Sequence, residues 1–150
     1  MPTEYLVVKL LHILVAIVAL GTSAGLGFVL EFFGDHPTHG AYVLRIVTRL
    51  VALVVMPGYV LMLLTGLWLI ELSWSWSVRW IQGAIWLWLV GALILGASLR
   101  VMNKQRKLAE SGDLSSPSYK RVFFAGRVLG GGVGLVIVAI LYLMVVKPVG

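Results

Sequence analysis

The fold is decided by stretches such as residues 5–33, YLVVKLLHILVAIVALGTSAGLGFVLEFF, in which Lys9, His12 and Glu31 are the only charged or imidazole side chains. A transmembrane helix needs about 20 predominantly apolar residues, and this stretch is longer. Three further stretches meet the same criterion, residues 44–72, 78–102 and 119–146. Because helices satisfy the backbone hydrogen bonds of a single apolar segment in lipid, the sequence predicts an all-α bundle of four transmembrane helices forming one membrane domain.

The composition supports a membrane protein and argues against several other classes. Of the 150 residues, 60% are hydrophobic and 12% are charged, whereas soluble domains carry about 25% charged residues. The chain has no cysteine, which excludes disulfides, iron–sulfur clusters and thiolate metal sites. The net charge of +6 does not indicate nucleic-acid binding, because the basic residues gather at the ends of the predicted helices. No nucleotide-binding loop, catalytic triad or zinc-binding helix motif is present.

The charge distribution predicts an orientation in the membrane. Basic residues concentrate around two connections, residues 34–43 and 103–118; they are Arg45, Arg49, Arg100, Lys104, Arg106, Lys107, Lys120 and Arg121. The opposite side carries only Lys9, Arg79 and Lys147. Short cytoplasmic loops are enriched in lysine and arginine. We therefore expect both connections to be cytoplasmic and both termini to be periplasmic, in a bacterial inner membrane.

Lys9 and His12 are the first candidate functional residues, because ionisable side chains are costly inside a bilayer. They are three residues apart and share one face of a helix. At ~1.5 Å per residue, His12 lies roughly 10 Å below the interface. His12 either hydrogen-bonds a neighbouring helix or is an axial ligand of the iron of haem b. Lys9 is nearer the surface, where its ammonium can reach the headgroups.

The second apolar stretch carries three further candidates, Arg49, Met56 and Tyr59. Arg49 is placed to pair with Glu31 or with a haem propionate. Met56 precedes Pro57, and proline removes a backbone donor and disturbs a helix. The disturbance alone accounts for this segment. A thioether and a phenol beside it also suit a cofactor pocket, since methionine can ligate haem iron.

Counting residues from the predicted membrane surfaces suggests what His12 faces. On this count His12 lies level with Tyr59, with residues 82–86 of the third stretch and with residues 131–134 of the fourth. The estimate assumes ~1.5 Å per residue and untilted helices. It predicts a site between His12 and the Met56–Tyr59 segment.

Glycines and one further arginine mark the fourth stretch. Gly126, Gly130 and Gly134 are spaced four residues apart, as are Gly21 and Gly25 of the first stretch. Such rows allow close packing of helices, and the alternative is a shallow groove for a flat cofactor. The other buried charge is Arg127; it either reaches the cytoplasmic surface, pairs with Glu31 or holds an acidic ligand.

Short motifs in the chain resemble known membrane-protein families. Residues 5–14, YLVVKLLHIL, resemble the opening of HemJ-type protoporphyrinogen oxidases, and the same style of first span occurs in CopD-like copper-resistance proteins. Residues 45–70, which include GLWL at 66–69, are similar to the second span of the HemJ family, and VVKP at 145–148 is similar to its C-terminus. The chain as a whole resembles a bacterial family of predicted integral membrane proteins of unknown function.

The resemblance implies a four-helix membrane protein that binds b-type haem, with the family's histidine at His12, its lysine at Lys9 and a looser methionine match at Met56. HemJ proteins carry further histidine and acidic residues toward the third and fourth spans, where this chain has residues 95–100 (LGASLR) and 127–130 (RVLG) instead. Porphyrinogen oxidation needs proton acceptors. We therefore do not expect an enzyme that acts on its own.

Four hypotheses remain open from the sequence. The first is a small haem-binding membrane protein with His12 as ligand. The second is a non-catalytic accessory subunit of a larger respiratory complex. The third is a HemJ-like oxidase, and the fourth is copper transport, for which the methionines are few and scattered. The expected partners are the lipid bilayer and either other membrane subunits or a second copy of the chain.

Overall fold

The computed structural model describes residues 3–36, 38–112 and 114–148. The helices are α1 (Thr3–Phe33), α2 (Gly40–Leu50), the π-helical turn η1 (Val51–Val55), α3 (Met56–Ser73), α4 (Arg79–Glu110) and α5 (Pro117–Val146). Within the described ranges there is no strand. Because α2, η1 and α3 run on without interruption, four continuous helical stretches are long and apolar enough to cross a membrane. The prediction of an all-α bundle with four such helices is confirmed.

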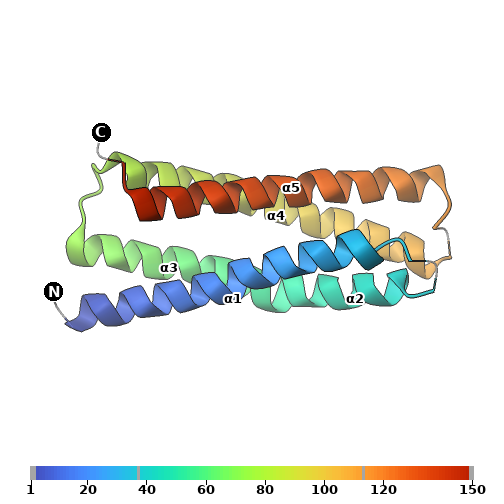
Figure 1. Ribbon diagram of the computed structural model, residues 1–150, viewed down its shortest axis with the longest axis horizontal. Helices are drawn as coiled ribbons and strands as arrows, with labels where there is room; N and C mark the ends of the chain where they lie inside the picture. The colour runs from blue at the N-terminus through green and yellow to red at the C-terminus, as the bar shows by residue number, and fades with distance from the viewer. Residues whose placement is uncertain (1–2, 37, 113, 149–150) are drawn as a thin grey trace.

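The helices form two antiparallel pairs (Figure 1). The α1 helix packs mainly on α3, and α4 packs mainly on α5. Both termini and the α3–α4 connection lie at one end of the bundle, which we call the terminal end (Figure 1). The α1–α2 and α4–α5 connections lie at the other end, which we call the basic end (Figure 1).

Apolar side chains cover the outside of the bundle. Many large hydrophobic residues are more than half exposed, among them Ile17, Phe28, Leu53, Leu93, Leu135 and Val145. Contiguous apolar surface of this extent is unfavourable in water. The exposed side chains are therefore the lipid-facing surface of an integral membrane protein.

The second span is disturbed just before Met56, as the Met–Pro pair predicts. Pro57 has no backbone N–H, so the regular helical hydrogen bond to the carbonyl four residues earlier is missing. The helix compensates by closing a wider turn, in which the N–H of Met56 bonds the carbonyl of Val51. The result is a single π-helical turn, and the span continues on both sides of it.

The polar connection between the third and fourth spans is shorter than the sequence suggests. The α4 helix continues past residue 102 to Glu110, so residues 103–110 are helical. This segment consists mainly of strong helix formers. The helix ends just before Gly112, whose φ of +78° suits glycine, and Ser116 caps the start of α5 by accepting a hydrogen bond from the N–H of Tyr119. The α2 helix likewise begins at Gly40, inside the predicted 34–43 connection.

Two clusters of buried apolar side chains lie at the middle and the basic end of the bundle. Val47, Val51, Val55, Tyr59, Leu95 and Met102 form one buried cluster, and Leu44, Ala109 and Tyr119 form another. The Tyr119 hydroxyl donates to the carbonyl of Gly34 at 2.6 Å and accepts from Nε2 of Gln105 at 3.2 Å. These contacts tie the end of α1 to α4 and α5 at the basic end.

Candidate functional site

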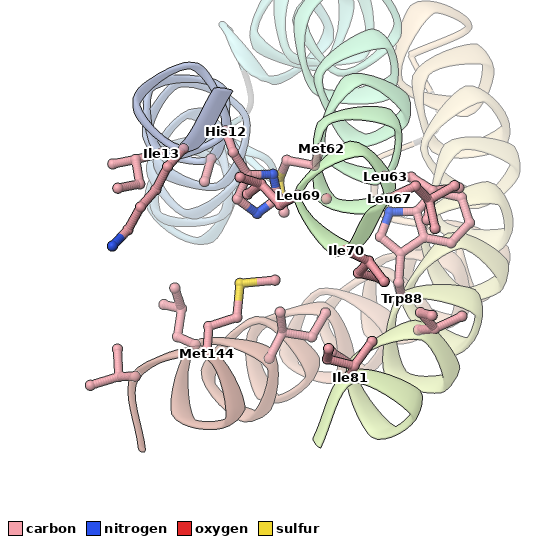
Figure 2. Close-up of a pocket in the computed structure, with 18 of the residues that line it drawn as sticks. His12, Ile13, Met62, Leu63, Leu67, Leu69, Ile70, Ile81, Trp88 and Met144 are labelled. Atoms are coloured by element: carbon pink, nitrogen blue, oxygen red, sulfur yellow. The ribbon is translucent and has the colours of Figure 1, made fainter. Parts of the chain in front are cut away.

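A cavity of about 620 Å³ lies between α1, α3, α4 and α5 at the terminal end (Figure 2). This volume is in the usual range of small-molecule sites, about 300–1,000 Å³. Its walls are almost entirely aliphatic and aromatic, and the described lining residues include no aspartate or glutamate. The ionisable lining side chains other than tyrosine are Lys9, His12 and Lys147. We call this space the histidine cavity.

His12 and Tyr5 are the buried ionisable side chains among the described residues of its wall, and His12 has 7% of its surface exposed. Its Nδ1 lies 2.8 Å from Oγ1 of Thr65. The other neighbours of that hydroxyl are acceptors, the carbonyls of Leu61 at 2.7 Å and Met62 at 3.2 Å. A hydroxyl has one proton to give. Two carbonyls in reach of that proton favour the tautomer in which Nδ1 of His12 donates to Thr65 and a neutral imidazole carries its lone pair on Nε2.

The imidazole fits closely against α3 because residue 66 is glycine. A Cβ placed on Gly66 would lie 3.3 Å from Cε1 of His12, which is tighter than ordinary contact. Figure 2 shows the ring projecting from α1 beside Met62, while the thioether of Met144 projects from α5 into the opposite side of the cavity. His12 therefore lies between α3, which carries its hydrogen-bond partner Thr65, and the part of α5 that carries the thioether of Met144.

The contact between α1 and α3 sets which residues meet His12. Two turns along the pair, a Cβ on Gly58 would lie only 2.6 Å from Cβ of Ala19, a side chain with no exposed surface. The step from Gly58 to Thr65 equals the step from Ala19 back to His12, so in antiparallel helices the two contacts share one register. The close approach at Gly58 thus brings Thr65 to His12.

The prediction of which residue of the second span lies at the depth of His12 is wrong. We expected Tyr59, and the contact is with Thr65, six residues further on, which is about 9 Å at ~1.5 Å per residue. On the fourth span the lining residues are Ile140, Leu141 and Met144 rather than residues 131–134. The expectation for residues 82–86 on the third span agrees with the lining residues Ile81, Ala84 and Ile85. Counting residues from the membrane surfaces does not take into account the register of α1 on α3, which the close contact between Ala19 and Gly58 sets.

The five predicted site residues are not all brought together. Lys9 and His12 line the histidine cavity, whereas Arg49, Met56 and Tyr59 do not. Arg49 is exposed near the basic end, and Met56 packs against the buried cluster around Val55. Whether any of the five binds a cofactor stays a prediction.

Tyr59 connects α3 to α4. Its ring stacks on Trp88 at a centroid distance of 5.2 Å. The Trp88 indole donates to the carbonyl of Tyr59 at 3.1 Å, and the Tyr59 hydroxyl donates to the carbonyl of Trp88 at 3.4 Å. These contacts account for the buried tyrosine without a ligand, and Trp88 itself lines the histidine cavity.

Arg127 pairs with Glu31, one of the alternatives left open by the sequence, and its guanidinium lies 5.6 Å from the ring of Phe123. The Glu31 carboxylate is therefore engaged by α5 rather than by Arg49. The pair lies beside a second cavity of about 610 Å³, which is lined by α1, α4 and α5 with one residue each from α2 and η1.

The glycine rows do not provide close helix packing inside this chain. A Cβ on Gly21, Gly25, Gly130 or Gly134 would meet no atom within 4 Å. Gly130 and Gly134 line the second cavity instead. The close approaches between helices occur at Gly58, Gly66, Gly83 and Gly91, and none of these glycines belongs to the rows that the sequence pattern singled out. Spacing alone cannot tell which glycine face meets another helix, because that depends on how the helices are rotated.

Thr65, Gly66 and Met144 are site residues that the sequence reasoning missed. The adjacent Thr65 and Gly66 were a usable signal, since small and hydroxyl residues mark helix contacts in membranes. Met144 has no such signal, because a methionine in an apolar helix looks like any lipid-facing residue. Among the described residues, no group of three or more histidine, aspartate or glutamate side chains is placed to hold a metal ion.

Comparison with known proteins identifies the family. Residues 6–148 match the family described as Predicted integral membrane protein (DUF2269), and the chain therefore belongs to that family. No curated protein and no solved structure matches the chain significantly.

Proposed function

We propose that this small integral membrane protein of the DUF2269 family binds haem b in the histidine cavity, with Nε2 of His12 as an axial ligand. The observation that carries the proposal is the 2.8 Å contact between Nδ1 of His12 and Oγ1 of Thr65, which we interpret as a hydrogen bond donated by Nδ1. A metal-bound histidine usually donates from its other ring nitrogen in this way, which selects the tautomer and the ring orientation. The proposal explains why this imidazole is buried in the wall of an apolar cavity, and what its Nε2 binds there.

The other residues of the cavity fit the same group. Its volume and apolar walls suit a large flat macrocycle. Gly66 leaves room beside the imidazole. Met144 replaces Met56 as the candidate for the second axial ligand, because Met56 does not line the cavity, whereas Met144 lines it on the side opposite His12, and a thioether can ligate haem iron. When bound, haem would supply one-electron transfer or reversible ligand binding.

The proposal is tested by titrating haem into the purified protein in lipid nanodiscs. We expect one haem to bind per chain, with an absorbance band that saturates at that ratio and shifts on reduction. The same titration into empty nanodiscs is the control, because haem partitions into lipid. A protein that gives no more signal than the empty nanodiscs would eliminate the proposal.

A role as an accessory subunit is a second candidate. It is favoured by the open glycine faces on α1 and α5, because Gly25, Gly130 and Gly134 leave room for a closely packed helix of another chain. Gentle purification from native membranes tests it, with partner subunits expected at constant ratio. A chain that always elutes alone would rule it out. The oxidase alternative gains no similar support, because the described cavity lining offers no carboxylate as a proton acceptor.

We further propose that the basic end is cytoplasmic and that both termini are periplasmic, in a bacterial inner membrane. The lysines and arginines around the α1–α2 and α4–α5 connections support this orientation. The chain has no cysteine, so single cysteines report sidedness cleanly. With an impermeant maleimide on intact cells, we expect Ser75→Cys to be labelled and Ser115→Cys to be protected until the cells are lysed. The reverse pattern would overturn the orientation.

A further inference from the structure

Two lysines border the histidine cavity at the terminal end, and neither has an acidic partner among the described residues. Lys9 comes from α1 and Lys147 from the end of α5, and both belong to the lining. Among residues 3–36, 38–112 and 114–148, the ion pairs join Arg45 to Glu110 and Arg127 to Glu31. The contacts of the two ammonium groups are with aromatic rings instead. An apolar cavity thus opens between two cations whose charge no carboxylate of the described chain neutralises.

Lys147 has a left-handed backbone conformation, and its ammonium group contacts two indole rings. Its φ of 45° and ψ of 60° are left-handed, and within the described residues it is the only non-glycine residue with positive φ. That conformation disfavours residues with a Cβ. Its Nζ lies 4.7 Å from the ring centroid of Trp74 and 5.8 Å from that of Trp80. The two rings meet edge to face at 5.1 Å, and all three residues line the cavity.

The position of Lys147 differs from that of an ordinary interfacial lysine. A snorkelling lysine extends its ammonium into water, whereas Lys147 turns back over Trp74 and Trp80 and is only half-exposed. An ammonium keeps three N–H donors, and rings satisfy it only through the cation–π attraction. Such a group is poised to donate to an anionic oxygen that arrives with a ligand.

We propose that Lys147, seated on Trp74 and Trp80, binds an acidic group of the ligand at the mouth of the histidine cavity, with Lys9 placed to bind a second. The inference rests on the proposed function for the identity of the ligand, and it adds the orientation. Haem b carries two propionates on one edge of an apolar macrocycle, which matches two ammonium groups at one end of an apolar cavity. The propionates would face the terminal end, and the face of the macrocycle would lie against the imidazole of His12.

The test compares acids with their esters. Haemin and haemin dimethyl ester are titrated into the full chain in zwitterionic nanodiscs, with absorbance as the readout. We expect the wild type to bind haemin about tenfold more tightly than the ester, as one charge-assisted hydrogen bond suggests. Lys147→Gln should remove most of that preference and leave the affinity for the ester unchanged. Arg79→Gln is the matched control, since it removes a positive charge at the same end from an exposed residue outside the lining. It should keep the preference.

A second pair of ligands separates this inference from the proposed function. Protoporphyrin IX and its dimethyl ester contain no iron, so their binding, followed by quenching of tryptophan fluorescence, does not depend on ligation by His12. A preference for the free acid that disappears in Lys147→Gln supports the acidic-group site even if haem gives no His12-dependent band. Equal affinity for acid and ester in the wild type overturns the inference even if haem binds. An equal loss in Arg79→Gln also overturns it, because the preference would then reflect surface charge alone.

Discussion

Replacing His12 by alanine will abolish the haem absorbance band of the purified protein. The substitution removes the proposed axial ligand, Nε2 of the imidazole whose Nδ1 contacts Thr65 in the cavity wall. Even loss of a residue that only orients a metal ligand costs about 10- to 100-fold in metal affinity, so we expect loss of the ligand itself to exceed ~100-fold on the same scale. Haem titration in nanodiscs, with the wild type measured in parallel, gives the two dissociation constants.

Two further variants make the His12 result specific. Thr65→Val removes the acceptor for Nδ1 but keeps the imidazole, so we expect an intermediate loss of about 10- to 100-fold. His39→Ala removes an exposed imidazole at the start of α2 that makes no side-chain cap, and it should bind haem like the wild type. A band that persists in His12→Ala, or disappears in His39→Ala, would place the ligand elsewhere.

Gly58→Ala will destabilise the bundle more than any other glycine-to-alanine change on α1 or α3. The added Cβ would lie 2.6 Å from Cβ of Ala19 and 3.5 Å from its Cα. Ala19 is fully buried and has no rotamer to move, so the two helix backbones must separate. Overpacking of this kind costs about 1–3 kcal/mol. Unfolding by a denaturing detergent, followed by circular dichroism, measures the change in the free energy of unfolding.

The same substitution should weaken haem binding, because the Ala19–Gly58 and His12–Thr65 contacts share one register of α1 on α3. Gly25→Ala is the control: it adds the same methyl group on α1 where no atom lies within 4 Å. Alanine also has the higher helix propensity, so this variant should be as stable as the wild type or slightly more stable. If Gly58→Ala and Gly25→Ala unfold alike, the close approach does not hold the pair together.

Much of the fold could be predicted because it depends on local sequence. The four apolar stretches are long enough to cross a bilayer wherever they sit, and the helix disturbance at Pro57 follows from one missing backbone donor. The helical extension to Glu110 was not predicted, because hydropathy ends the third span at residue 102 and residues 103–110 are polar. Helix propensity favours their helical state, but hydropathy, which located the spans, does not register it.

The candidate site also has some residues that could be predicted from the sequence and others that could not. His12 and Lys9 could be selected from the sequence, because the cost of an ionisable group in lipid applies to any bundle. Thr65, Gly66 and Met144 could not, since a helical pattern shows which residues share a face but not which face of another helix lies opposite. That choice was made by a single close approach, Ala19 against Gly58, which sets the register of two antiparallel helices. The sequence alone thus determined that this is a four-helix membrane protein with a histidine in its apolar interior. The tertiary structure decided what the histidine faces, because register and rotation between helices depend on contacts between residues far apart in the chain.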